Sequence, residues 1–131
     1  MICLSTIFGY PGDRHGGRTP TVLYRRPVSS TDMGIAHRTW PMGAKIRITN
    51  LRTKKSAVGV VLDRGTWGMR DAKGWFNSRK PRNRARGKAL FKKIGEKAYC
   101  GCVDVTYGLA RLIGHNGARE RVRIELLKGK L

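Results

Sequence analysis

Acidic residues are scarce in this sequence of 131 residues, which holds 8 Asp and Glu against 28 Lys and Arg. The resulting net charge of +20 favours polyanionic partners, and binding through it weakens as salt screens the charges. Nucleic acid, anionic cell-wall polymers and acidic membrane surfaces all fit, so charge alone does not choose among them. Few carboxylates also limit chemistry that needs two of them, such as hydrolysis by an inverting glycosidase.

Long apolar runs are also missing. No stretch approaches the roughly 20 apolar residues of a membrane-spanning helix, so we expect no membrane span. The start, Met1 to Leu4, has neither basic residues nor a long apolar run, so we expect no signal peptide and synthesis in the cytoplasm. The length predicts one domain, 1–131, and we expect a monomer.

Only three cysteines are present, Cys3, Cys100 and Cys102. An odd count without a signal peptide argues against a disulfide framework and predicts reduced thiols, partly buried as small apolar residues. Cys100 and Cys102 offer two metal ligands that His115 or His15 would supplement, but structural zinc sites usually show four ligands in recognisable pairs. We therefore expect no metal and no cofactor.

Hydrophobic periodicity predicts a mostly β chain. Ala44, Ile46 and Ile48 alternate with polar residues, as a half-buried strand requires. The continuous apolar run over 57–62 suits a strand buried on both faces. We expect further strands over 4–8, 103–105 and 122–126, with 9–32 mainly loop.

One short helix is expected after Thr106, whose hydroxyl is suited to cap it. Leu109, Ala110 and Ile113 would form its buried face, and Gly114 would end it. Several short strands, one short helix and many glycines together predict a small closed barrel.

Residues 66–100 break this pattern. They hold 11 Lys and Arg against Asp71 and Glu96, and so carry 9 of the 20 net positive charges. We expect a basic loop leading into an amphipathic helix with Leu90, Phe91 and Ile94 on one face. The segment is either an electrostatic clamp on a polyanion or a solvated excursion whose apolar side docks on the barrel. The candidate polyanion-binding residues are Arg79, Lys80, Arg82, Arg84 and Arg86.

Seven short motifs follow one another in an order and spacing that resemble the rare lipoprotein A family. They are Ser5–Gly9, His15–Thr19, Ala36–Gly43, Arg47–Asn50, Asp63–Gly65, Val103–Thr106 and Arg121–Ile124. The resemblance covers nearly the whole chain apart from 66–100. It implies a six-stranded double-psi β-barrel, the fold of expansins and barwin-like proteins, with a short helix and one long basic insertion at about 66–100.

The resemblance also implies a role on peptidoglycan. Characterised relatives bind peptidoglycan, and some are lytic transglycosylases, lyases that cut glycan strands without water. By the family pattern, Asp63 is the carboxylate at the floor of the cleft and His37 is its neighbour, which makes both candidate catalytic residues. A single carboxyl can protonate the leaving oxygen and then deprotonate the sugar's own hydroxyl.

The chain departs from the family upstream of His37. Catalytic relatives carry a Glu there, but no Glu precedes Glu96, and the matching region over 24–27 offers two arginines. Asp32 is the only nearby acid, and it lies too close to His37 in sequence to be an obvious substitute. A neighbouring arginine also lowers the pKa of a carboxyl, and only burial of Asp63 would offset this.

Structural alternatives stand beside these roles. Asp63 precedes Arg-Gly, where an Asp often only caps a turn, and His37 is suited to pin its own loop as a buried hydrogen-bonding residue. Asp104 either joins the site or bonds backbone amides. Trp67 either stacks on a sugar or covers the insertion, and Tyr10 either lines the cleft or packs in its loop. The candidate substrate contacts are Arg64, Trp67, Tyr10 and Asp104, whereas Trp40 and Trp75 are expected to be packing residues.

Two function classes follow. The first is a peptidoglycan-directed protein that binds or cleaves glycan, resembling septal-ring lytic transglycosylases. A phage-encoded protein released at lysis or carried in a virion would reach the wall without a signal peptide. The second is a non-catalytic basic barrel that binds nucleic acid with steep salt dependence, or serves as a virion structural component. No recognised nucleic-acid motif accompanies the charge.

Overall fold

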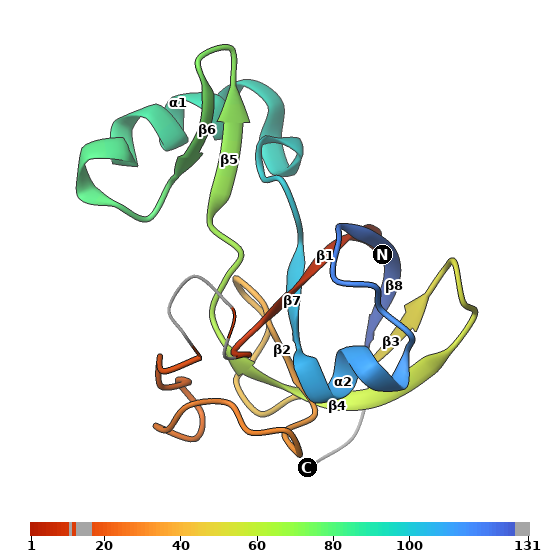
Figure 1. The fold of residues 1–131 in the computed structure, drawn as a ribbon. Helices are drawn as coiled ribbons and strands as arrows, with labels where there is room; N and C mark the ends of the chain where they lie inside the picture. Colours follow the sequence, from red (N-terminus) through yellow and green to blue (C-terminus); the bar gives the residue numbers. More distant parts are fainter. Residues whose placement is uncertain (11, 13–16, 128–131) are drawn as a thin grey trace.

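The computed structural model describes residues 1–10, 12 and 17–127. Six strands close into a barrel in the order β1-β7-β2-β4-β3-β8 (Figure 1). They are β1 (Ile2–Phe8), β2 (Gly34–Ala36), β3 (Lys45–Asn50), β4 (Ser56–Asp63), β7 (Val103–Thr106) and β8 (Glu120–Leu126). β1 runs parallel to β7 and β2 parallel to β4, while the other neighbours are antiparallel. The expected mostly β, six-stranded double-psi barrel with a short helix and a long basic insertion is confirmed.

Aliphatic side chains fill the barrel because apolar and polar residues alternate along its strands. In β3, Ile46 and Ile48 are fully buried, as the alternation predicts. In β4, Val61 and Leu62 are fully buried, but Val58 is 46% exposed. Only the second half of this apolar run is therefore covered on both faces. The loop that precedes β2 lies against this second half of β4, since the amide of Leu23 donates to the carbonyl of Leu62 at 3.0 Å.

The helix α2 (Tyr107–Leu112) begins as the sequence predicts. The Thr106 hydroxyl accepts a hydrogen bond from the amide of Leu109 and itself donates to the carbonyl of Asp32 at 2.7 Å. Leu109, Ala110 and Ile113 are buried. Gly114 follows with φ +67°, a conformation that favours glycine. The cap, the buried face and the stop are confirmed.

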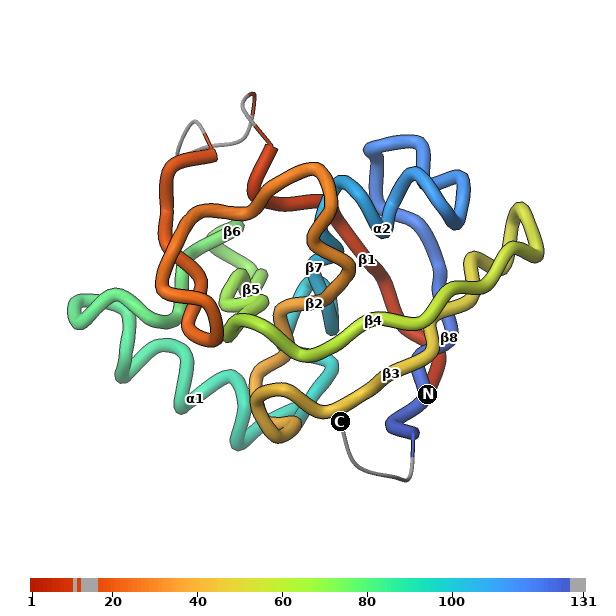
Figure 2. Tube along the Cα trace, turned by 90° about the horizontal axis from the view of Figure 1, so that it is seen from below, coloured from red at the N-terminus to blue at the C-terminus, as the bar shows by residue number. Residues whose placement is uncertain are grey.

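The insertion has more structure than the sequence indicates. It forms a hairpin of β5 (Gly68–Asp71) and β6 (Gly74–Asn77), then a 3-10 turn η1 (Pro81–Asn83), helix α1 (Arg84–Ile94) and a second turn η2 (Gly95–Ala98). Figures 1 and 2 show the hairpin and α1 standing outside the ring of barrel strands. The helix is confirmed, while the hairpin corrects the expectation of a basic loop, because two four-residue strands in a basic stretch leave little periodicity to detect.

This subdomain has a small apolar core of its own. Met69, Phe76 and Ala98 are buried together, with Leu90 and Tyr99 packed against them. Phe91 of α1 remains 42% exposed. Ile94 is 43% exposed as well, so Leu90 is the residue of this apolar side that packs against the hairpin core. The apolar side of α1 therefore does not dock on the barrel, in contrast to one interpretation of the sequence.

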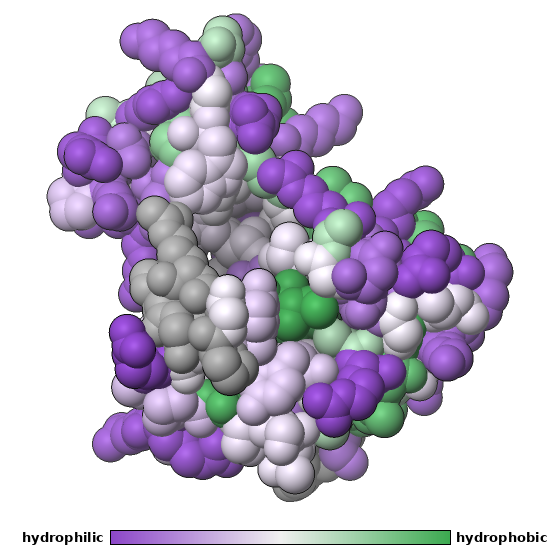
Figure 3. All heavy atoms as spheres, viewed as in Figure 1, coloured by the Kyte–Doolittle hydropathy of each residue, from purple (hydrophilic) through white to green (hydrophobic). Residues whose placement is uncertain are grey.

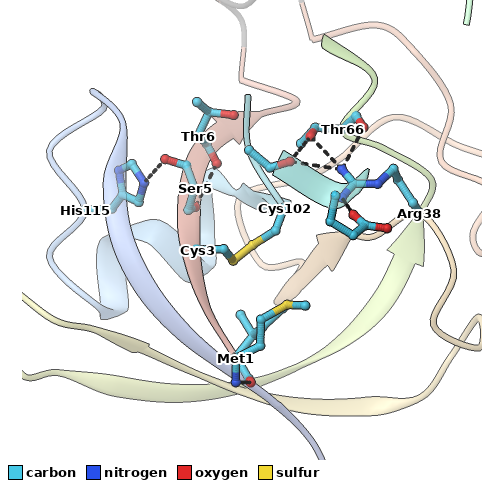
Figure 4. The surroundings of a disulfide bond; sticks show 11 residues. Met1, Cys3, Ser5, Thr6, Arg38, Thr66, Cys102 and His115 are labelled. Carbon is cyan, nitrogen blue, oxygen red and sulfur yellow. Dashed lines mark hydrogen bonds and ion pairs between the residues drawn. A yellow bond between two sulfur atoms is a disulfide. The ribbon is translucent and has the colours of Figure 1, made fainter. Parts of the chain in front are cut away.

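The arginine Arg38 ties both ends of the insertion to the barrel. Its guanidinium donates to the carbonyl of Thr66 at 3.0 Å and to that of Gly101 at 2.9 Å (Figure 4). It also pairs with Glu96 at 2.7 Å and lies 3.6 Å from the centre of the Tyr99 ring. One side chain thus fixes where the insertion leaves and re-enters the barrel.

A disulfide joins Cys3 of β1 to Cys102, which immediately precedes β7 (Figure 4). The two Cα atoms lie 5.7 Å apart although 99 positions separate them in sequence. The expectation of three reduced thiols is therefore wrong, since the parallel pairing of β1 with β7 brings distant cysteines together. Cys100 alone stays a free thiol.

The sequence predicts neither a metal site nor a membrane-spanning helix, and the structure bears on both for the residues it describes. Among residues 1–10, 12 and 17–127, no cluster of three or more His, Cys, Asp or Glu side chains is arranged to hold a metal ion. His15, one of the two histidines considered, lies outside these residues. Within the same part of the chain, no helix has the length and apolar character needed to cross a membrane.

Candidate active site

Four neighbouring barrel strands place Thr6, Asp104, Ala36 and Asp63 in one row. Thr6 of β1 lies opposite Asp104 of β7, Asp104 opposite Ala36 of β2, and Ala36 opposite Asp63 of β4. Residues that lie opposite each other in a sheet share a face, so the two carboxylates lie on the same side, separated by one strand. The Ala36 side chain between them is buried, and Gly65 lies over it, since a Cβ at Gly65 would come within 3.6 Å of the Ala36 Cβ.

This face is the outer one, facing away from the barrel interior. Ile35 and Val105, which precede Ala36 and follow Asp104, are fully buried in the barrel core and lie opposite each other. Because side chains alternate along a strand, Ala36 and Asp104 point the other way. The row therefore lies on the outside of the barrel.

A shift in register brings Asp63 to this face. Ile35 pairs with Val61, but the next residue, Ala36, pairs with Asp63, so Leu62 is skipped. Such bulges re-aim side chains and are common next to active sites. Without the shift, alternation from Val61 would turn Asp63 toward the interior.

Asp104 is the more protected carboxyl of the pair. It accepts a hydrogen bond from the Thr6 hydroxyl, which stabilises the charged form. Burial nevertheless raises the pKa of Asp104 above its usual range, and the negative charge of Asp63 raises it further. The surroundings of Asp104 thus favour its protonated form.

Asp63 is half-buried and experiences opposing influences. Burial raises its pKa, whereas the backbone amides of Arg64 and Val22, the latter at 3.3 Å, stabilise the carboxylate. The positive charges of Arg79 and Arg64 also lower its pKa, but burial outweighs them. The sequence raised the question of whether a neighbouring arginine lowers the pKa of Asp63, and burial offsets that effect.

A cleft of about 260 Å³ opens beside Asp104, between the barrel and the insertion. Figure 3 shows this side of the molecule hollowed between the two parts. Trp67 and Trp75 both line the cleft, together with Thr6 and Asn77. The two indoles provide flat apolar surfaces beside polar groups, the combination from which ligand sites are built.

The tryptophans occupy the cleft differently. Trp67 is largely covered, and its indole N–H is buried without a hydrogen-bond acceptor among the described residues. Trp75 is 45% exposed, and its indole lies so close to Gly68 that a Cβ there would come within 2.5 Å of it. Trp75 was expected to be a packing residue, but the structure places it in the wall of the cleft.

His37 meets Asp63 through the backbone alone. Its amide donates to the carbonyl of Asp63 at 3.0 Å, while its side chain lines a different cavity, which the disulfide also borders. The ring Nδ1 accepts from the amides of Thr39 and Trp40 at 3.1 and 2.9 Å, and the ring stacks on Trp40. Burial, with Arg38 and Arg64 nearby, lowers the pKa of His37 to about 4. This arrangement favours the role of pinning the loop over a catalytic one.

Arg64 and Tyr10 also lie away from the cleft walls. The Arg64 guanidinium donates to the carbonyls of Trp40 and His37, so it holds the same loop. Tyr10 is 37% exposed and is not among the described residues that line the cleft beside Asp104. Neither residue contacts the carboxylate pair by a side-chain hydrogen bond within the described part of the chain.

A structural ion pair occupies the region in which the resemblance leads one to look for a Glu. Arg26 donates to both carboxylate oxygens of Asp32, at 2.7 and 2.9 Å, and the amide of Ser29 donates to the same group. These bonds lower the pKa of Asp32. The Asp32 carboxylate therefore stabilises its own loop and does not take the place of the Glu.

The basic run does not form one continuous strip. Arg86 pairs with both oxygens of Asp71 at 2.6 Å, and Arg79 lies 5.3 Å from the centre of the Trp67 ring. Lys80 and Arg82 line a cavity with Arg86, whereas Arg84 faces another cavity with Arg79. The five residues proposed from sequence thus divide between two sides of the insertion.

Asp104 as the partner of Asp63 is what sequence reasoning missed. The sequence indicated Asp104 only as a candidate substrate contact, yet the barrel brings these residues, 41 positions apart, to either side of Ala36. The only signal in the sequence was an acid within an apolar strand, where an unpaired charge is costly. No protein-family model and no curated protein matches this chain.

Proposed function

We propose that this protein binds peptidoglycan glycan strands in the cleft beside Asp104 and cleaves them as a lytic transglycosylase. The observation that carries the proposal is the pair Asp63 and Asp104, in register on either side of Ala36. Their surroundings differ, because Asp104 is the more deeply buried and Asp63 is held by backbone amides and nearby arginines. Acid-base cleavage of a glycosidic bond uses such a pair, with one carboxyl protonated and the other ionised. The resemblance to the rare lipoprotein A family supplies the choice of peptidoglycan.

In this proposal the more deeply buried carboxyl, Asp104, is the acid. It protonates the oxygen that leaves the anomeric carbon. Asp63, as the carboxylate, takes the proton from a hydroxyl of the same sugar as that oxygen attacks the anomeric carbon. One carbon–oxygen bond breaks and another forms, one proton is given and one is taken, and no water is consumed.

Strand geometry favours this reaction over a covalent mechanism. Neighbouring strands lie about 4.8 Å apart, so backbones separated by one strand lie roughly 10 Å apart. On the outer side of a curved sheet, side chains do not converge. Retaining glycosidases need carboxyls only about 5–5.5 Å apart, which this spacing does not favour. The remaining choices are attack by water or by the sugar's own hydroxyl, and the family resemblance favours the latter.

The basic surface suits the same substrate. Peptidoglycan carries carboxylates on its peptides and anionic polymers alongside its strands, and a net charge of +20 attracts both.

The test is digestion of purified peptidoglycan, with the fragments identified by mass spectrometry. Wild-type protein should release fragments with anhydro-sugar ends, and Asp63→Asn and Asp104→Asn should each release at least about 100-fold less. Glu125→Gln, an exposed acid of β8, is the matched control and should cleave normally.

Two other outcomes would contradict the proposal. Absence of fragments, with all proteins still sedimenting with the wall, would indicate a binding module without catalysis. Absence of both fragments and sedimentation would remove the cell wall as the target and favour the basic, nucleic-acid-binding alternative.

A further inference from the structure

A second cavity, of about 500 Å³, lies within the insertion between the hairpin and α1. Its apolar surface comes from Trp67, Met69, Phe91 and Tyr99. Four positively charged side chains complete its lining, namely Arg79, Arg84, Lys88 and Lys92. No acidic residue lines it among the described residues. The cavity thus combines an apolar interior with a cationic rim.

Three of these cations form a line along α1. Arg84, Lys88 and Lys92 follow at intervals of four, so they lie one above another on one face of the helix. At 1.5 Å per residue the line is about 12 Å long, with roughly 6 Å between neighbouring charges. All three are exposed, and none forms an ion pair within the described part of the chain. These charges are available to a ligand.

The cavity and the candidate active site share one wall residue, Trp67, which lines both the cleft beside Asp104 and the cavity of the insertion. A ligand seated across Asp104 that extends past this indole ring would therefore meet the cationic cavity next. The occupant that fits is a substituent of the molecule bound in the cleft.

We propose that this cavity binds the short acidic peptides that peptidoglycan strands carry, an inference that rests on the proposed function. The aliphatic parts of such a peptide lie on Phe91, and its carboxylates meet the line of Arg84, Lys88 and Lys92. The insertion then makes the enzyme favour strands that still carry peptides over strands from which they have been removed.

Nucleic acid fits the cavity less well. Single-stranded nucleic acid binds by stacking bases on open aromatic faces. Here arginines already cover a face of two rings, since Arg79 lies over Trp67 and Arg38 lies over Tyr99. Phe91 is the remaining ring of the lining, which is too little for successive bases. An acidic peptide needs no ring face.

The experiment measures binding of soluble glycan strands, with and without their peptides, by titration calorimetry. All proteins carry Asp63→Asn so that strands are not consumed. The test variant adds Arg84→Gln, Lys88→Gln and Lys92→Gln. The matched control instead adds Lys45→Gln, Arg121→Gln and Arg123→Gln, three exposed cations of β3 and β8 outside the cavity lining. Circular dichroism checks that each variant folds.

We expect peptide-bearing strands to bind roughly 10-fold or more tightly than stripped strands, because each of three exposed ion pairs contributes up to about fivefold. The test variant should lose this preference and still bind stripped strands, while the control retains it. Equal binding of both strands by the parent, or equal loss for both in the test variant, would overturn the inference and leave the proposed function intact.

Two further outcomes separate the remaining explanations. If neither strand binds the parent protein, the proposed function fails and the inference fails with it. If a single-stranded oligonucleotide binds more tightly than the strands, and the test variant loses that binding, the cavity is a nucleic-acid site instead.

Discussion

Replacing Asp63 by Asn should lower the pKa of Asp104. The two carboxylates sit on strands separated by β2, so their backbones lie roughly 10 Å apart. At an effective dielectric constant of about 20, two unit charges at that distance repel by about 1.7 kcal/mol, or about 1.2 pKa units. Loss of the Asp63 charge removes this repulsion. The Asp104 carboxyl should then release its proton about one unit lower.

The assay is a carbon-detected NMR titration of the Asp104 carboxyl in wild type and in Asp63→Asn. Asp71→Asn serves as the control, because Asp71 lies in the hairpin and is neutralised by Arg86. It should leave Asp104 unchanged. A shift below about 0.3 units in Asp63→Asn would refute the pairing, since it would mean that the carboxylates do not share one field.

Three more predictions concern stability. Asp104→Asn should stabilise the fold at pH 7 while abolishing cleavage. Because the pKa of Asp104 is raised, the folded state binds the proton more tightly than the unfolded state, so wild-type stability falls as pH rises above the unfolded pKa of 3.8. Denaturant titrations of both proteins at pH 4 and pH 7 measure this difference. Glu120→Gln should lower the free energy of unfolding by roughly 1–2 kcal/mol at pH 7, because Arg52 holds the pKa of the buried Glu120 at about 2. This contribution to stability is complete above the unfolded pKa of 4.5 and is lost as pH falls toward 2. A destabilisation that persists at pH 2 would contradict the ion-pair explanation. Cys3→Ser with Cys102→Ser should lower the free energy of unfolding by about 3 kcal/mol, and reductant should produce the same loss in wild type and in Cys100→Ser, which both contain the disulfide. Without reductant Cys100→Ser should be as stable as wild type, and a loss of about 3 kcal/mol in that variant would mean that Cys100 is a bridging cysteine.

Local rules predicted much of the barrel. The alternation in β3, the cap at Thr106 and the glycine after α2 are properties of a few adjacent residues, and all three are confirmed. The hairpin β5–β6 was missed because its strands are only four residues long and lie in a stretch dominated by charge. The helix α1 was found, but its buried partner was not, since spacing shows which face is apolar and not what covers it.

The candidate site divides in the same way. Asp63 and Trp67 were singled out from the residues and the family resemblance. Trp67 lines the cleft, while Asp63 lies one strand away from Asp104 on the same face. Trp75 was expected to be a packing residue, because the sequence around an aromatic residue does not show whether its side chain is exposed. His37 was placed beside Asp63, which the structure bears out for the backbone, but alternation turns its side chain into another cavity.

The sequence by itself determined the charge, the strands with strong alternation, the short helix and the basic character of the insertion, because each depends on composition or on neighbours a few residues apart. The tertiary structure decided which distant residues meet. The Cys3–Cys102 disulfide follows from parallel strand pairing, and the partnership of Asp63 with Asp104 follows from register and from one skipped residue in β4. A shift of one residue in that pairing reverses the face on which a side chain lies. Register is fixed by packing of the whole barrel, so no local pattern reveals it.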